Sequence, residues 1–337
     1  MIAAPMASVE IITKNVDDLP PDWEVMFSGS ALYGKSFLKL VHNNVINSNQ
    51  LYYYKSSAEG TDCGIVSCVR MRATRWMPPM KTFLCRFPLS LPTRGYALTS
   101  CSVKVAEEII EKAGTGLKVI IIDQNTPHSP LEGWTEKSGM PYAVFHNRYN
   151  TFDEYISSLK INYRKSIRRS MRKFKGVVVR EENKDDFSAE HYLLYRYVAR
   201  RAKYRGFEMG GKFFTGMNIG HAYISAYAEG ELIGWVLLLY DGDIIYAPIC
   251  GFKAKANAKY DVWRNLHLEA IRKAIDSRYS RVEFGDTAEV GKIKLGCVLE
   301  SRSLLAKHDN TLLNMLLVRT RWLEYRMPGV AYHPYGR

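Results

Sequence analysis

The chain has 337 residues, of which 47% are hydrophobic and 24% are charged, and it carries a formal net charge of +13. This composition is that of a globular protein and excludes disorder over most of the length. A chain of this length predicts two domains, and its basic surplus predicts polyanionic partners without indicating a fold.

Sequence patterns exclude three further classes of protein. The N-terminal segment MIAAPMASVEIITKN has no basic stretch followed by an apolar one, so we expect no secretory signal and a cytoplasmic protein. No apolar run approaches the roughly 20 residues that span a bilayer, although the basic surface allows peripheral membrane contact. The cysteines form no C-x-x-C pair, so we expect reduced core thiols and no metal site: Cys63, Cys68, Cys85, Cys101, Cys250 and Cys297.

Runs rich in β-branched and aromatic residues predict the strands of the first half: 50–56, 63–73, 81–92, 117–125 and 141–150. The run at 117–125 is apolar throughout, which is typical of a strand that is buried on both faces. Between the third and fourth strands, residues 103–114 have apolar positions on one helical face and end at a glycine. This pattern predicts a helix.

The second half begins with a strongly basic segment. Residues 151–176 have helical periodicity, and Gly176 is a candidate C-cap. From Lys160 to Lys175 there are eight basic residues in sixteen and no acid. Two interpretations remain open, because a charge run of this kind is either a solvated helix face or one wall of an anion site.

The remaining elements follow in close succession. A second helix is predicted at 190–206, and residues 222–240 are predicted to hold two strands joined at Glu229-Gly230. Further strands are predicted within 240–252, 281–285 and 301–308, and helices at 261–277 and 310–326. The Asp241-Gly242 pair predicts a hairpin turn, and Asp261 is a candidate N-cap. Both halves therefore run through strands, a helix, a buried strand and another strand, which predicts two similar α/β domains.

Three stretches of the second half resemble one family. They are SLKINYRKSIRRSMRKF, AEGELIGWVLLLYDGDIIYAPICGFKAKANAKYDVWRNLHLEAIRKAI and RVEFGDTAEVGKIKLGC. Residues 151–308 are similar to the GNAT superfamily, and in detail to its FemAB-type N-acyltransferases. The resemblance implies an α/β fold (an α+β mixed sheet) with two GNAT-like acyltransferase domains packed side by side, an N-terminal one at 1–150 and a C-terminal one at 151–337.

The resemblance also implies an enzyme that transfers an acyl or aminoacyl group to an amine in biosynthesis. The co-substrate would be acyl-CoA, acyl carrier protein or aminoacyl-tRNA, with no permanently bound cofactor, and the acceptor an amine-bearing small molecule or peptide. Acetyl-CoA enzymes of this superfamily have a glycine-rich loop before the central helix. Here the corresponding segment, GFKAKANAKYD, has one glycine and three lysines, which places ordinary acetyl-CoA use in doubt.

Three residues are candidates for catalysis. By resemblance, Lys292 contacts a substrate phosphate or the reacting carbonyl, with Lys294 as its alternative; a solvated loop lysine is the other interpretation. Asp286 follows a glycine at a strand end and can accept the proton of the amine, or simply cap a turn. Glu208, in a loop with three glycines, is a second candidate base or an ordinary surface carboxylate.

Further residues are candidates for binding. Arg164 and Arg168 lie one helical turn apart and can reach one anion, and the remaining candidates for the donor phosphates are Lys253, Lys259 and Lys294. By resemblance Tyr246 flanks the donor site and orients the leaving group, unless it is a core tyrosine. His267, in the middle of a helix, orients the substrate or is a packed histidine.

A rival function keeps the same fold without the chemistry. A non-catalytic basic nucleic-acid-binding protein would also account for the net charge and the arginine-rich segment. No helix-turn-helix, RNA-recognition aromatic motif or zinc module is present in the sequence. The rival predicts salt-dependent binding without turnover, whereas the transferase predicts a new amide product.

Overall fold

A computed structural model describes residues 9–21, 23–27, 29–56, 63–74, 77–87, 89, 91, 107, 110–111, 115–123, 131–202, 206–321, 323–325 and 334–335. The chain forms two compact units. The first contains Met1–Pro88, Thr93–Met140 and Ser301–Met327, and the second contains Leu89–Pro92, Pro141–Glu300 and Pro328–Arg337.

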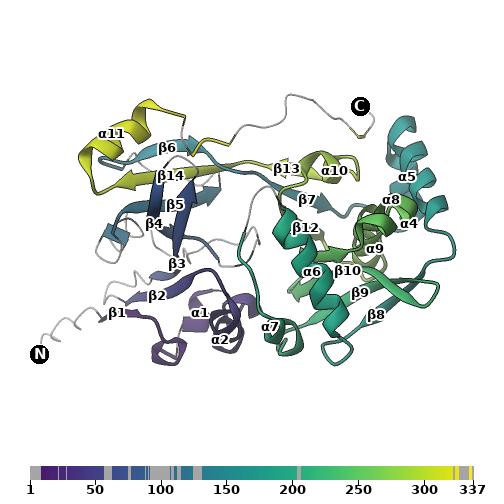
Figure 1. The fold of residues 1–337 in the computed structure, drawn as a ribbon, viewed down its shortest axis with the longest axis horizontal. Helices are drawn as coiled ribbons and strands as arrows, with labels where there is room; N and C mark the ends of the chain where they lie inside the picture. Colours follow the sequence, from purple (N-terminus) through teal and green to yellow (C-terminus); the bar gives the residue numbers. More distant parts are fainter. Residues whose placement is uncertain are drawn as a thin grey trace, which may run out of the picture. The chain divides into compact units, whose positions relative to one another are not determined.

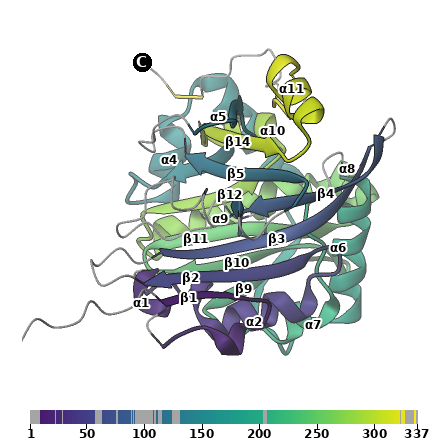
Figure 2. The ribbon, with the colours of Figure 1, turned by 90° about the vertical axis from the view of Figure 1, so that its left-hand side faces the viewer.

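The first unit is built on a seven-stranded sheet (Figure 2). Its strands, in spatial order, are β1 (Val9–Thr13), β2 (Asn49–Ser56), β3 (Cys63–Thr74), β4 (Met77–Cys85), β5 (Leu117–Asp123), β14 (Arg302–His308) and β6 (Thr135–Ser138). Its described helices are η1 (Val16–Asp18), α1 (Trp23–Met26), η2 (Ala31–Tyr33), α2 (Lys35–Asn44) and α11 (Thr311–Arg319). Leu317 of α11 packs on Leu117 and Val119 of β5, which covers this end of the sheet.

The second unit has its own seven-stranded sheet (Figure 1). Its strands, in spatial order, are β8 (Val178–Glu182), β9 (His221–Ala228), β10 (Glu231–Asp241), β11 (Ile244–Phe252), β12 (Arg281–Asp286), β7 (Tyr142–His146) and β13 (Val298–Glu300). Its helices are α4 (Phe152–Ser158), α5 (Ile161–Lys173), α6 (Ala189–Arg201), α7 (Gly211–Thr215), α8 (Ala254–Tyr260), α9 (Val262–Asp276) and α10 (Glu289–Ile293).

The two sheets have the same layout. In each, the strands at the fourth and fifth positions run parallel and all other neighbours run antiparallel. The sixth position is exchanged between the halves of the chain. Strand β7 follows β6 of the first sheet but pairs with β12, and β14 follows β13 of the second sheet but pairs with β5.

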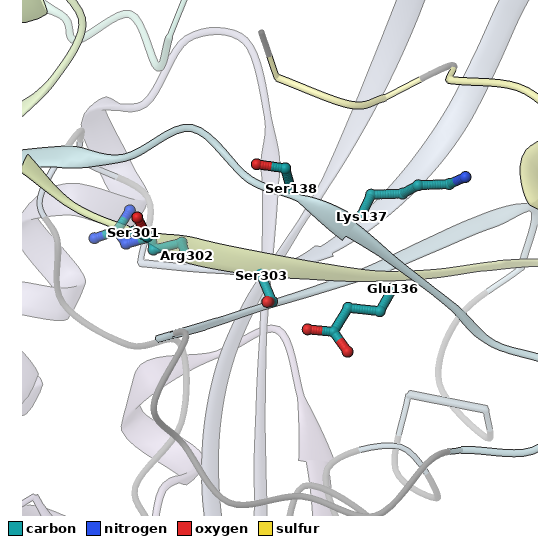
Figure 3. Close-up of a pocket in the computed structure, with 6 residues that line it drawn as sticks. All are labelled: Glu136, Lys137, Ser138, Ser301, Arg302 and Ser303. Carbon is teal, nitrogen blue, oxygen red and sulfur yellow. The ribbon is translucent and has the colours of Figure 1, made fainter. Parts of the chain in front are cut away.

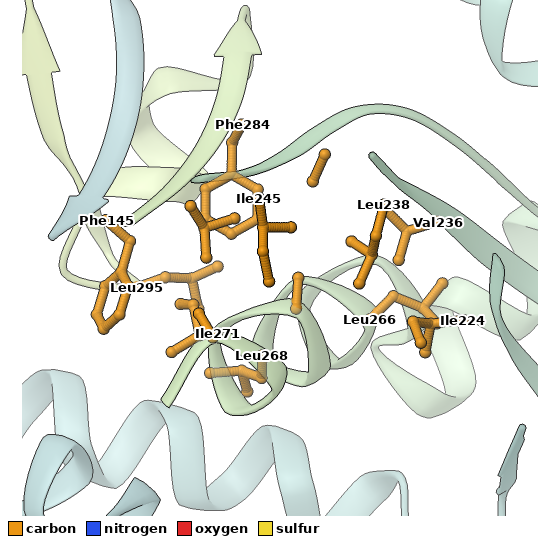
Figure 4. Close-up of a cluster of buried hydrophobic side chains, with 14 of the residues drawn as sticks. Phe145, Ile224, Val236, Leu238, Ile245, Leu266, Leu268, Ile271, Phe284 and Leu295 are labelled. Atoms are coloured by element: carbon orange, nitrogen blue, oxygen red, sulfur yellow. The ribbon is translucent and has the colours of Figure 1, made fainter. Parts of the chain in front are cut away.

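Helices α6 and α9 pack on opposite faces of the second sheet. Gly251 of β11 lies against α6, because a Cβ there would be 2.6 Å from the backbone nitrogen of Tyr195. The adjacent register position belongs to the other face, where a Cβ at Gly234 would be 2.6 Å from Val262 of α9. The apolar side of α9 contributes Leu266 and Ile271 to a core that β10, β11 and β12 complete (Figure 4).

Much of the predicted layout is confirmed. The mixed α/β class, the strands at 117–125 and 301–308 and the helix that begins after Asp261 are all present. The predicted helix at 103–114 lies mostly outside the described residues. No helix among the residues described is both long and apolar enough to cross a bilayer.

Three expectations differ from the structure. The units are not divided at residue 150, because β7 belongs to the second sheet and residues 301–327 belong to the first unit. The basic segment 151–176 is two helices, α4 and α5, because Leu159 leaves the helix to form a bridge with Tyr335. The final helix ends at Arg319 and does not extend to residue 326.

Candidate active site

In the second sheet the parallel strands β11 and β12 pair over a short stretch and then separate. Ile244–Tyr246 pair with Arg281–Glu283. Beyond these residues β11 continues to Phe252 against β10, and the pairing of β12 continues to Asp286 against β7. The edges of β11 and β12 that face each other there form no ladder.

A β-bulge lies where the strands separate. Leu238 of β10 opposes two residues of β11, Ala247 and Pro248. A bulge bends its strand, and proline inside a strand is confined to edges and bulges because it has no N–H to donate. The proline in YAPIC is the sequence signal that could have predicted this bulge.

Lys292 lies on α10, and its ammonium reaches the end of β12. Its Nζ donates hydrogen bonds to the backbone oxygens of Phe284 at 2.8 Å, Gly285 at 3.1 Å and Asp286 at 2.9 Å. An ammonium has three donors, so all of them are used, and the side chain is 3% exposed. Burial lowers the pKa of Lys292 to about 8, although the neighbouring Asp286 acts in the opposite direction.

His267 packs beneath this group on α9. Its ring lies between those of Trp263, at 4.2 Å between centroids, and Phe284, at 5.1 Å. Its Nδ1 donates to the backbone oxygen of Trp263 at 2.7 Å, one turn back in the helix. Burial and the charge of Lys292 lower the pKa of His267 to about 3, so the imidazole is neutral. This environment is that of a packed histidine.

Two thiols act on Lys292, and Tyr246 lies on the neighbouring part of β11. Tyr246 is 5% exposed and is the last residue of β11 that pairs with β12. Burial raises the pKa of Cys250 to about 11 and of Cys297 to about 12, while the charge of Lys292 acts in the opposite direction on both. Both thiols are therefore protonated at neutral pH, which agrees with the expectation of reduced core cysteines.

Comparison with protein-family models gives one match, and it lies in the second unit. Residues 162–292 match the model of the acetyltransferase (GNAT) domain family, from the start of α5 to Lys292. This match covers less than half of the chain. A comparison of the sequence with curated proteins found no match.

Solved structures extend the similarity to both units. A crystal structure of FemX is 11% identical, with coverage of 93% of this chain and 100% of that chain and a TM-score of 0.57. A conserved protein of unknown function from Bacteroides thetaiotaomicron is 8% identical, with coverage of 87% of this chain and 98% of that chain and a TM-score of 0.52. L-PGS from Bacillus licheniformis is 12% identical, with coverage of 91% and 98% and a TM-score of 0.48. The fold is therefore FemAB-like, and the second unit carries a GNAT acyltransferase domain.

The segment before the central helix of the GNAT domain is a helix rather than a glycine-rich loop. Lys253, its N-cap, lies 3.0 Å from Glu190 and 3.2 Å from Glu231. Lys259 lies 3.6 Å from Glu229. Both ammonium groups are thus neutralised by carboxylates of the same unit. Lys294 is the C-cap of α10, two residues beyond Lys292.

The basic helix α5 of the GNAT domain differs in this respect. Among the described residues, no carboxylate forms an ion pair with any of its six basic side chains. Arg164 donates to the backbone oxygen of Ser157 at 3.0 Å, and the other five are exposed: Lys165, Arg168, Arg169, Arg172 and Lys173. Like charges spaced three and four residues apart repel each other along a helix, so this face lacks a counter-charge of its own.

Glu208 has a partner of its own. Glu208 is 4.0 Å from Arg196 of α6, on the face of the sheet opposite α9, so the structure does not group it with Asp286 and Lys292. In the first unit a pocket of about 410 Å³ lies between β6 and β14 (Figure 3). None of the predicted site residues line it: its walls are Glu136, Lys137, Ser138, Ser301, Arg302 and Ser303.

Proposed function

We propose that this protein transfers an aminoacyl group from an RNA-borne ester to an amine acceptor. The observation that carries the proposal is the exposed basic face of α5, which has no carboxylate partner within the described residues. Elsewhere in the GNAT domain, four cations form ion pairs with acids of the chain: Lys253, Lys259, Arg264 and Lys273. Helix α5 instead gathers six cations within 13 residues without such a pair in the part of the chain that the structure describes, and this concentration of positive charge is a surface suited to an external polyanion.

The difference between the paired lysines before α9 and the cations of α5, which form no ion pair among the described residues, favours RNA over acyl-CoA as the donor. A coenzyme pyrophosphate would be held at the segment before α9, but Lys253 and Lys259 are already paired there. Helix α5 has 13 residues and is therefore about 20 Å long, which matches several consecutive phosphates of a nucleic acid strand. An acidic carrier protein is the third donor class, and the experiment below separates it from RNA.

The chemistry requires little of the protein beyond placement. A neutral amine attacks the ester carbonyl, a C–N bond forms and the C–O bond to the ribose breaks. The proton lost by the amine passes by way of a base to the departing ribose oxygen, which leaves as a hydroxyl. Asp286, at the end of β12, is the base in this proposal. Backbone amides of β11 beyond Tyr246, where β12 no longer pairs, would stabilise the oxyanion. No covalent enzyme intermediate is needed.

A donor screen tests the proposal. Purified protein is incubated with a panel of amines and, in parallel, with aminoacyl-tRNA, acyl-CoA and acyl carrier protein, and products are identified by mass spectrometry. We expect a new amide with aminoacyl-tRNA. An amide formed from acyl-CoA or from the carrier protein alone would contradict the RNA donor, and tRNA binding without product would favour the non-catalytic rival.

Charge reversal on α5 provides the matched test of the surface. Arg168→Glu removes an exposed, unpaired cation of α5, and Lys212→Glu makes the same change at an exposed position of α7. We expect Arg168→Glu to weaken tRNA binding and to reduce the slope of log K against log salt by about 0.7–0.9 per lost phosphate contact. Lys212→Glu should leave the slope unchanged, and equal effects of the two variants would remove α5 from the binding surface.

A further inference from the structure

Three backbone carbonyls at the end of β12 converge on one buried cation. The oxygens of Phe284, Gly285 and Asp286 all accept from Nζ of Lys292. Successive carbonyls of a strand point to alternate sides, so their convergence requires the chain to leave the extended conformation. A buried ammonium that donates to carbonyls and not to a carboxylate is costly, because its charge lacks a hydrogen-bonded counter-ion.

The backbone at this position is strained. Gly285 has a φ of 68°, and it is followed by Thr287 at 67° and Ala288 at 53°. Glycine adopts such angles freely, but two consecutive side-chain-bearing residues in the left-handed region, one of them β-branched, persist only where their surroundings hold them. The side-chain hydrogen bonds from Lys292 hold the residues just before this pair, and the backbone N–H of Lys292 donates to the oxygen of Ala288 at 3.1 Å.

We propose that Lys292 is a positioning residue of the transferase site, whose ammonium holds the end of β12 in its left-handed turn and thereby sets the position of Asp286. This inference rests on the proposed function. It assigns Lys292 to the backbone of its own chain, in place of the direct substrate contact that resemblance implied, because the ammonium is buried and its three donors are occupied.

The charge state of Lys292 governs this arrangement. A neutral amine has one donor fewer than an ammonium, so deprotonation removes at least one of the three hydrogen bonds. Because burial lowers the pKa of Lys292 to about 8, the loss occurs at mildly alkaline pH. The titratable groups that act on it come from four elements and the turn before β13: Asp286 of β12, Glu289 of α10, Cys250 of β11, His267 of α9 and Cys297.

The experiment has one readout that does not depend on activity. Amide hydrogen exchange and amide chemical shifts of residues 285–288 are compared in the wild-type chain and in Lys292→Met. The matched control is Lys273→Met, which removes an ammonium from α9 that pairs with Glu181 at 2.8 Å. We expect exchange at residues 285–288 to become about tenfold faster or more in Lys292→Met alone, with other protected amides unchanged.

The second readout is the reaction. With the donor that the screen identifies, we expect kcat of Lys292→Met to fall about tenfold or more while KM for the donor stays constant. Unchanged exchange at residues 285–288 would overturn the positioning role, whatever the activity. Altered exchange without any transferase reaction from the wild type would leave the positioning role intact and contradict the proposed function instead.

A pH titration of the wild-type chain covers the case in which Lys292→Met does not fold. We expect the amide shifts of residues 285–288 to titrate together, with a midpoint near the pKa of about 8. The reaction rate should fall over the same interval. Shifts at residues 285–288 that stay constant from neutral pH to about pH 10 would overturn the inference.

Discussion

Asn265 on α9 holds Ser170 on α5. The side-chain Nδ2 of Asn265 donates to Oγ of Ser170 at 3.1 Å and lies 3.3 Å from its backbone oxygen. Both residues are buried, at 3% and 1% exposure. The same amide group reaches the backbone oxygens of Tyr260 and Asp261, where α8 meets α9. One buried side chain therefore joins the basic helix to the central helix of the GNAT domain.

Removal of this amide should be costly. Asn265→Leu leaves buried oxygens of Ser170 and of the α8–α9 junction without their donor, so we expect the free energy of unfolding to fall by about 1–3 kcal/mol. Ser170→Ala should cost about 0.5–1.5 kcal/mol, because it removes one acceptor and leaves the others. Urea unfolding of the two single variants and the double variant gives the coupling energy. Strictly additive losses would show that the two side chains do not interact.

The buried ammonium of Lys292 predicts an unusual dependence of stability on pH. Its pKa falls from 10.5 to about 8 on folding. Below pH 8 Lys292 is protonated in both the folded and the unfolded chain, and the full cost of burying its charge applies. Between pH 8 and 10.5 only the unfolded chain binds the proton, so the free energy of unfolding rises with pH. At 1.36 kcal/mol per pKa unit, the contribution is worth about 3 kcal/mol.

The measurement compares unfolding free energies of the wild type and Lys292→Met across this interval. Their difference should shift in favour of the wild type as the pH rises from about 8 to 10.5. A difference that stays flat would show that Lys292 has an ordinary pKa. If the positioning role is also correct, activity falls while stability rises, and a merely structural lysine would not produce this opposition.

The close packing of Gly251 predicts that its replacement by alanine costs more stability than the same change at Gly242. In Gly251→Ala the new Cβ would lie 2.6 Å from the backbone nitrogen of Tyr195, which cannot move without displacing α6. We expect a loss of about 1–3 kcal/mol from this overpacking. Gly242→Ala is the control, since its Cβ meets nothing within 4 Å and it costs only the strain of a φ of 57°, about 1 kcal/mol. Thermal unfolding that ranks Gly242→Ala as the more harmful change would contradict this packing.

Local patterns accounted for most of the elements. Strand β5 and helix α9 follow from composition and period, because each is specified by its own residues. The break between α4 and α5 does not. It depends on Leu159 bridging Tyr335, a partner far away in the sequence that no window around residue 159 contains. The boundary at residue 150 differed for the same reason, because strand exchange is a property of the sheets.

In the candidate site, too, the positions of residues were predictable from the sequence and their contacts were not. Resemblance and position predicted four site residues, Asp286, Lys292, Tyr246 and His267, which lie on β12, α10, β11 and α9. Their local chemistry was not predictable, because the occupation of Nζ of Lys292 by three carbonyls depends on backbone angles. The pairing of Lys253 with Glu190 and Glu231 joins residues from three separate elements, and no spacing in the sequence indicates it.

The exchange of the sixth strands predicts which fragments of this chain can fold. A fragment of residues 151–337 lacks β7, which lies between β12 and β13, and it loses Ala143 and Phe145 from the core. A fragment of residues 141–300 is shorter but retains every strand of the second sheet. We therefore expect the shorter fragment to be the more stable of the two.

Circular dichroism during urea unfolding checks this expectation. Residues 141–300 should unfold in one cooperative transition, while residues 151–337 should show a broad, weakly cooperative change. A fragment of residues 1–150 should also fail to fold, because it lacks β14, and without that strand Leu117 and Val119 lose Ala306 and Leu317 as packing partners. If residues 151–337 instead unfold as cooperatively as residues 141–300, then β7 is dispensable and the two halves fold as domains divided at residue 150.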